Sequence, residues 1–126
     1  MKKFMVLGSL LFIFLAACST NTTLTTDEEV TNLVKSYLEA LETKDISSMV
    51  KYADDIRFPD KVEQKEQYSS IDEDITDTKI VELKKVSGTE FEATVELINN
   101  GNLAEYTFPV EKQKTGWKVI VGQDSN

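Results

Sequence analysis

Apolar residues between positions 30 and 53 recur at spacings of three and four, which predicts two amphipathic helices. The first is expected to begin with a capping box, with Thr26 as the cap and Glu29 three residues later, and to end near Thr43. Asp45 is expected to cap a shorter helix that ends near residues 54–55. The two apolar faces comprise Val30, Leu33, Val34, Tyr37, Leu38 and Leu41, then Ile46, Met49, Val50 and Ala53.

The segment from residue 58 to residue 77 has a weaker pattern. Phe58 precedes Pro59, and a residue before proline is disfavoured in a helix, so the second helix should have ended here. Asp60 is expected to cap a third helix that runs through Tyr68, with Val62 and Tyr68 facing inward. Residues 72–77 are predicted to form an acidic loop.

From residue 78 onward apolar and polar residues alternate with period two, which predicts antiparallel strands with one buried face. The alternation covers residues 80–86, 90–97, 104–111 and 117–121. Short turns containing Gly88, Gly101 and Gly116 separate these runs, so consecutive strands should pair as a four-stranded meander. Pro109 cannot donate a ladder hydrogen bond, which predicts a bulge or an outward-facing nitrogen there.

The N-terminus has the pattern of a secretory signal. Lys2 and Lys3 precede an apolar stretch over residues 4–17, which is too short to span a bilayer with margin. The only cysteine, Cys18, follows Leu15-Ala16-Ala17, and this tetrapeptide resembles a bacterial lipobox. The resemblance implies that Cys18 is diacylated and becomes the new N-terminus, and two acyl chains suffice for stable anchoring. The alternative is an ordinary cysteine within a transmembrane anchor.

The chain is expected to have four parts: a signal peptide over residues 1–17, a lipidated cysteine with a flexible tether over 18–25, one domain over 26–122, and a tail over 123–126. Without Lys2 and Lys3, 12 basic residues remain against 22 acidic ones, a net charge of −10. Such a surface repels nucleic acid and anionic lipid, so contact with the membrane is expected through the lipid on Cys18. A single arginine beside 13 lysines fits an AT-rich genome and, with the lipobox, a Gram-positive bacterium.

Three stretches resemble the nuclear transport factor 2-like (cystatin-like) superfamily. Tyr37-Leu38-Glu39-Ala40-Leu41 and Asp45-Ile46-Ser47-Ser48-Met49 resemble its opening helices, and Gly116-Trp117-Lys118-Val119-Ile120 resembles its last strand. The resemblance covers residues 27–122. It implies an α+β fold in which N-terminal helices pack on a curved, four-stranded antiparallel meander, forming a cone whose open end is often a pocket. Members include isomerases, dehydratases and cyclases, others bind ligands or proteins, and many dimerise, so the fold alone assigns no function.

The amino-acid composition argues against a catalytic function. The chain has no histidine, which removes the side chain best suited to proton transfer near neutral pH and the usual zinc ligands. The aspartates are expected at helix caps and in the acidic loop, so we expect no catalytic residue, metal or cofactor. Residues 72–77 could attract calcium, but they lack the turn glycine and distal glutamate of an EF-hand loop, and a solvated loop is the alternative.

Four aromatic residues with a polar tip are the candidates for a ligand pocket: Tyr37, Tyr52, Tyr106 and Trp117. If they gather at the mouth of the cone, they would line an apolar pocket with a few hydrogen-bonding groups. Ordinary core packing is the alternative. The outer sheet face, rich in Glu, Thr and Lys, contains Ile80, Ile98 and Ile120 and is a candidate surface for a homodimer or a basic partner. Scattered surface apolar residues are the alternative there.

We therefore expect a lipid-anchored protein on the extracytoplasmic side of the cell membrane, with a non-enzymatic domain that binds an envelope protein or a small ligand. The first alternative is an enzyme of the isomerase type. It predicts an Asp or Glu inside the cone that contacts a tyrosine and has a strongly raised pKa. The second alternative is that a fragment of the signal peptide, residues 10–16, acts as a peptide pheromone.

Overall fold

The computed structural model describes residues 24–123. The predicted signal peptide, Cys18 and most of the tether therefore lie outside the described residues, as do residues 124–126 of the tail. Within the described part of the chain, no helix is both long enough and apolar enough to cross a membrane.

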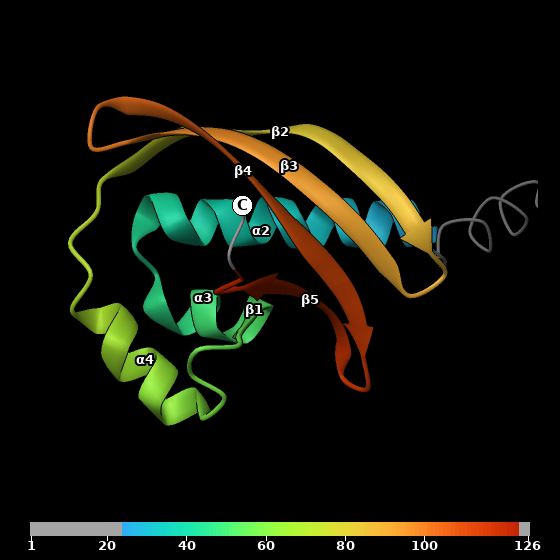
Figure 1. The fold of residues 1–126 in the computed structure, drawn as a ribbon, viewed down its shortest axis with the longest axis horizontal. Helices are drawn as coiled ribbons and strands as arrows, with labels where there is room; N and C mark the ends of the chain where they lie inside the picture. Colours follow the sequence, from blue (N-terminus) through green and yellow to red (C-terminus); the bar gives the residue numbers. More distant parts are fainter. Residues whose placement is uncertain (1–23, 124–126) are drawn as a thin grey trace, which may run out of the picture.

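Residues 24–123 form three helices and a five-stranded sheet (Figure 1). The helices are α2 (Thr26–Thr43), α3 (Ile46–Tyr52) and α4 (Lys61–Ser69), and the strands are β1 (Ala53–Asp55), β2 (Ile75–Ser87), β3 (Glu90–Asn99), β4 (Asn102–Gln113) and β5 (Gly116–Val121). The long strands β2, β3 and β4 curve over α2, while α3 and α4 lie near one end of the domain, as Figure 1 shows. The expected α+β arrangement is present.

The capping box of α2 begins one residue earlier than the sequence pattern predicted. Thr25 is the cap, and its hydroxyl accepts from the backbone N–H of Glu28, whose carboxylate accepts from the backbone N–H of Thr25. The prediction of Thr26 and Glu29 was wrong because the sequence offers two adjacent threonine–glutamate pairs at the same spacing. Asp45 and Asp60 cap α3 and α4 as predicted.

The sheet has five strands in the order β1-β5-β4-β3-β2, not the predicted four. The additional strand is β1, which pairs in parallel with β5 through Ala53↔Val119, Asp54↔Ile120 and Asp55↔Val121. These three residues were predicted to end the second helix, because Ala53 continues its apolar spacing. A three-residue strand is too short to show an alternation of its own, so its pairing with β5 is visible only in the fold.

The meander of β2 to β5 follows the predicted order. The register of β3 and β4 runs without a shift from Glu90↔Glu111 to Asn99↔Asn102, and it passes through Glu92↔Pro109. Pro109 is therefore not in a bulge, contrary to one of the two predictions for it. It lies immediately before Val110, the residue at which the pairing of β4 with β5 begins.

The core lies between α2 and the concave face of the sheet. Val30, Val34 and Leu38 of α2 are buried in one cluster with alternate residues of β3, which include Phe91 and Val95. Phe91 also packs edge-on against Trp117 of β5, with ring centroids 5.6 Å apart. The predicted inward positions of β3 are thus buried, and those of α2 are buried except Leu33 and Leu41, which are partly buried.

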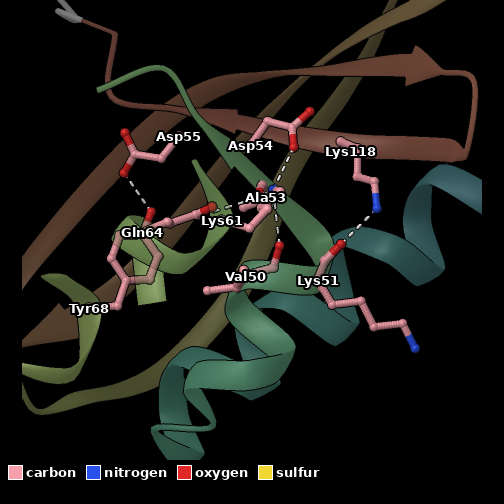
Figure 2. A network of polar contacts seen from close by, with 9 residues as sticks. All are labelled: Val50, Lys51, Ala53, Asp54, Asp55, Lys61, Gln64, Tyr68 and Lys118. Carbon is pink, nitrogen blue, oxygen red and sulfur yellow. Dashed lines mark hydrogen bonds and ion pairs between the residues drawn. The ribbon is translucent and has the colours of Figure 1, made fainter. Parts of the chain in front are cut away.

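The orientation of α4 differs from the prediction at one position. Tyr68 is buried as expected, but Val62 is 68% exposed, and the buried residue of that face is Gln64. Gln64 donates from Nε2 to the backbone oxygen of Ala53, at 3.3 Å, so a polar side chain attaches the helix to β1 (Figure 2).

Candidate functional site

A cavity of about 360 Å³ opens between the long helix and the sheet. Its apolar walls come from α2, from the buried face of β3, and from the place where β4 and β5 separate. Arg57, from the loop after β1, and Glu73, from the loop before β2, add charge. The lining comprises Tyr37, Leu38, Leu41, Arg57, Glu73, Ile75, Val95, Leu97, Asn99, residues 106–109 and residues 120–123.

A second cavity, of about 190 Å³, adjoins the first on the side of α3 and α4. The two share several wall residues, among them Tyr37, Arg57 and Val121. The second also reaches Met49 and Tyr68. Tyr37 and Arg57 therefore stand between the two spaces and contribute polar groups to both.

The buried carboxylate of Asp55 lies behind Arg57. The side chain of Asp55 is inaccessible to solvent, and each of its oxygens accepts two hydrogen bonds. Oδ1 accepts from the backbone N–H and the Nε of Arg57, at 3.0 and 2.9 Å. Oδ2 accepts from Nη2 of Arg57 at 2.7 Å and from the hydroxyl of Tyr68 at 2.6 Å, a contact drawn in Figure 2. A buried charge needs this degree of pairing.

These contacts set the ionisation of the cluster. Burial alone would raise the pKa of Asp55, but the hydrogen bonds from Arg57 and Tyr68 outweigh burial and hold that pKa below its ordinary value. The pKa of Arg57 is raised, mainly because Asp55 accepts its hydrogen bonds. Burial and the bond to Asp55 together raise the pKa of Tyr68 to about 12. At neutral pH the cluster is therefore an ion pair with a neutral tyrosine.

The Asp55 carboxylate also determines which residue can follow β5. Gly122 has φ +92°, and a Cβ built on it would lie 2.6 Å from Oδ1 of Asp55 and 3.1 Å from Nε of Arg57. Both the backbone conformation and the lack of space therefore require glycine here. The chain turns over the ion pair at this point and continues along the cavity wall to Gln123.

Tyr37 brings a second polar group to the cavities. Its side chain is buried among α2, β4 and the Arg57 loop, and its ring packs edge-on against Phe108 at a centroid distance of 6.1 Å. Burial, reinforced by the nearby Tyr68 and Asp55, raises the pKa of Tyr37, so its hydroxyl stays protonated. That hydroxyl has no hydrogen-bond partner among the described residues, although it lines both cavities.

The structure brings together two of the four aromatic candidates. Tyr37 and Tyr106 both line the larger cavity, and Tyr106 is 45% exposed at its mouth. Tyr52 lines a separate, shallow hollow beside α2 and α3, near Ser48. Trp117 is packed in the core against Phe91 and lines none of the cavities described here.

Sequence reasoning missed both charged groups behind the cavity. Asp55 was assigned to a helix end, and Arg57 was noticed only as the single arginine of the chain. The combination of a lone arginine two residues after an aspartate, just before Phe58-Pro59, was the available signal. Among the described residues, no group of three or more cysteine, aspartate or glutamate side chains could hold a metal ion.

Comparison with known proteins gives matches only at the level of structure. No protein-family model matches the sequence, and no curated protein does. Solved structures do match. A ketosteroid isomerase-like protein from Erwinia carotovora atroseptica aligns with a TM-score of 0.52 and 21% identity over 73% of this chain and 88% of that one.

Two further structures show the same arrangement. An NTF2-like protein of unknown function from Pseudomonas putida aligns with a TM-score of 0.51 and 13% identity, covering 77% of this chain and 84% of that one. A domain with a cystatin-like fold from Nostoc punctiforme gives 0.51 and 13%, covering 77% and 75%. The domain has the nuclear transport factor 2-like, cystatin-like fold. Identities this low assign the fold alone.

Proposed function

We propose that this protein is an extracytoplasmic lipoprotein, anchored through Cys18, whose domain binds a small molecule in the cavity between α2 and the sheet without transforming it. The observation that carries the binding role is the cavity itself, whose wall includes Arg57 and Tyr37, a tyrosine whose hydroxyl has no hydrogen-bond partner among the described residues. An oxygen atom of a ligand in the cavity would accept a hydrogen bond from that hydroxyl.

The cavity indicates the kind of ligand. Its volume of about 360 Å³ lies within the range of small-molecule sites. Aliphatic and aromatic side chains supply most of the walls, while Tyr37 and Arg57 offer hydrogen-bond donors. Asp55 already neutralises the charge of Arg57, and Glu73 adds a negative charge at the rim. A compact apolar molecule with an uncharged oxygen acceptor, such as a carbonyl, fits these walls best.

The state of Asp55 supports a binding role rather than catalysis. A general base needs a pKa near the working pH and a free lone pair within reach of the substrate. Asp55 has a lowered pKa, and both oxygens are already occupied by donors from Arg57 and Tyr68. Asp55 is therefore poorly suited to accept a proton from a substrate as a general base.

Cavity binding can be tested with N-phenyl-1-naphthylamine, a neutral apolar probe whose fluorescence rises in dry pockets. We expect saturable binding of one probe per protein. Val121→Phe should abolish it, because Val121 lines both cavities and the larger ring occupies their space. Val81→Phe, at a half-exposed site on β2, is the matched control and should bind normally. Equal binding by the two variants would reject the cavity as the site.

The anchoring part of the proposal has its own test. Cells that express the full chain would be labelled with a clickable palmitate analogue and fractionated. Wild type should carry the label and remain with the membrane, whereas Cys18→Ser should lose the label and appear unprocessed or released. A Cys18→Ser protein that is processed and still tightly bound to the membrane would disprove the lipobox interpretation.

One observation favours the isomerase alternative: Asp55 does contact a tyrosine, Tyr68, at 2.6 Å. That alternative requires the pKa of Asp55 to be strongly raised. Carbon-13 NMR titration of the Asp55 carboxyl group decides between the two. We expect a midpoint below the ordinary value of about 4. A midpoint above about 6 would support the enzyme, because a raised carboxyl pKa suits proton transfer near neutral pH.

A further inference from the structure

The sheet protects the long outer edge of β2 against pairing with another strand. Three lysines lie along this strand, at positions 79, 84 and 85, and its register with β3 shifts three times. The carboxylate of Glu42, from α2, also accepts from the backbone N–H of Thr78 at 2.9 Å. Charged edge residues, irregular register and covering side chains are the usual defences of an exposed strand.

The other outer edge, on β1, is covered by side chains of α4. The backbone oxygen of Ala53 accepts from Nζ of Lys61 at 2.9 Å and from Nε2 of Gln64 at 3.3 Å. Lys61 also bonds the carboxylate of Asp54 at 2.7 Å, and Figure 2 shows these groups gathered over the short strand. The strand is only three residues long, so this edge offers no room for a partner.

A third edge lies within the sheet, where β4 separates from β5. Residues 102–109 of β4 pair with β3, and only residues 110–113 pair with β5 (Figure 1). In an antiparallel ladder alternate residues turn their N–H and C=O groups away from a given neighbour, so this stretch has backbone groups without a strand partner on the side of β5. No turn, loop or cap hydrogen bond of the described backbone reaches residues 102–109.

This inner edge has fewer defences than the other two, with Glu105 as its one charged residue and Pro109 at its end. Its sequence, Asn-Leu-Ala-Glu-Tyr-Thr-Phe-Pro, has no lysine, and its register with β3 contains no bulge. Leu103 is 71% exposed and Tyr106 is 45% exposed. An edge without a bulge or a lysine, beside exposed apolar side chains, is a template that β-augmentation can use.

We propose that residues 102–109 of β4 bind an extended, basic peptide segment of another protein as an additional strand. The negative charge of the protein favours a basic peptide as the added strand. The chain has a net charge of −8, and Glu105 and Glu73 lie along the edge and at the adjacent cavity rim. A second copy of the chain would bring the same negative charge to the contact, whereas lysines on a partner strand would meet these carboxylates. This interaction goes beyond the proposed small-molecule site, although residues 106–109 of the edge also line the cavity.

The test uses a fluorescein-labelled, N-acetylated peptide of alternating lysine and valine, with the same length as the free edge. The control peptide has every backbone amide N-methylated, which keeps its charge and side chains but removes its hydrogen-bond donors. Binding would be followed by fluorescence anisotropy, and the contact would be located by amide hydrogen exchange of the domain. We expect only the unmethylated peptide to bind, with exchange at residues 102–108 slowed at least about tenfold and the β2 edge unchanged.

Protein variants make the test specific to this edge. Leu103→Lys places one lysine on the bare edge and should weaken peptide binding about threefold or more, while Val81→Lys adds the same charge to β2 and should not. Val121→Phe, which fills the cavities, should retain peptide binding, so failure of the cavity proposal and failure of this one are distinguishable.

Three outcomes would overturn the inference. Equal binding of the methylated peptide would show attraction by charge alone. Protection at β2 in place of β4, or none at all, would remove the edge as the site. A dimer in sedimentation equilibrium with residues 102–108 already protected in the free protein would assign the edge to a second copy of the chain.

Discussion

At the scale of single residues, Asp55 is the centre of the fold's polar contacts. It joins three parts of the chain, because β1 carries it, α4 supplies Tyr68, and the intervening loop supplies Arg57. Its burial could not be predicted from the sequence, since one aspartate after another at a helix end is a common solvated pattern. Only the pairing of β1 with β5 turns Asp55 inward and Asp54 toward Lys61.

The hydrogen bond from Tyr68 to Asp55 should contribute measurably to stability. Tyr68→Phe removes a donor to a buried charge and should lower the free energy of unfolding by about 1.5–3 kcal/mol in a urea melt. Tyr52→Phe is the matched control, because Tyr52 lies away from this cluster, and it should change stability by less than about 0.5 kcal/mol. Equal losses of unfolding free energy in the two variants would show that the hydrogen bond to Asp55 does not stabilise the fold.

The lowered pKa of Asp55 also predicts a pH dependence. Because the folded protein holds the ionised form, the stabilisation is present above the unfolded pKa and disappears as pH falls through the folded value. The free energy of unfolding of wild type should therefore decrease as pH is lowered from about 5. Asp55→Asn should start less stable and show a smaller decrease, and an identical slope in both proteins would contradict the assignment.

At the scale of elements, the sequence pattern predicts the long helices and strands better than it predicts their ends. Periodicity predicted α2, α3 and the meander because apolar residues recur regularly along each of them, although α3 fully buries only Met49. It failed at β1, which is too short for a pattern, and at the start of α2, where two threonines offer equivalent spacing. The spacing alone does not distinguish Thr25 from Thr26 as the cap, and the structure shows that Thr25 is the capping residue.

The corrected cap can be tested directly. Thr25→Ala should lower the free energy of unfolding by about 1 kcal/mol, because Glu28 loses the side-chain acceptor of its backbone N–H. Thr26→Ala should be nearly neutral, since that residue is already helical. Chemical denaturation of both variants gives the comparison, and a larger loss at Thr26 would restore the cap predicted from sequence.

The turn after β5 offers a second test at this scale. Gly122→Ala should destabilise the protein by more than about 1 kcal/mol, because the new methyl group meets Oδ1 of Asp55 and the backbone has positive φ. Gly88→Ala, with nothing within 4 Å of the added Cβ, is the control and should be close to neutral or slightly stabilising. A neutral Gly122→Ala would show that the turn can move away from the ion pair.

At the scale of the whole molecule, the sheet curves over α2 and opens where β4 leaves β5, and the cavity lies at that opening. Helix and strand periodicity predicted the α+β arrangement, and the polar tips of the aromatic residues pointed to Tyr37 and Tyr106 among four candidates. The sequence did not distinguish these two residues from Tyr52 and Trp117. Whether an aromatic side chain lines a cavity or packs in the core depends on its tertiary neighbours. Arg57 remained unassigned because loops carry no periodic signal.

Native mass spectrometry of the full chain, isolated gently from cells that express it, is the decisive test for a ligand in the cavity. We expect wild type to carry one small organic molecule per chain, absent from Val121→Phe and retained by Val81→Phe. Loss of that molecule from Tyr37→Phe, with the fold intact, would identify the hydroxyl as its anchor. A wild-type protein that carries no molecule, or the same molecule in all variants, would contradict a ligand site in this cavity.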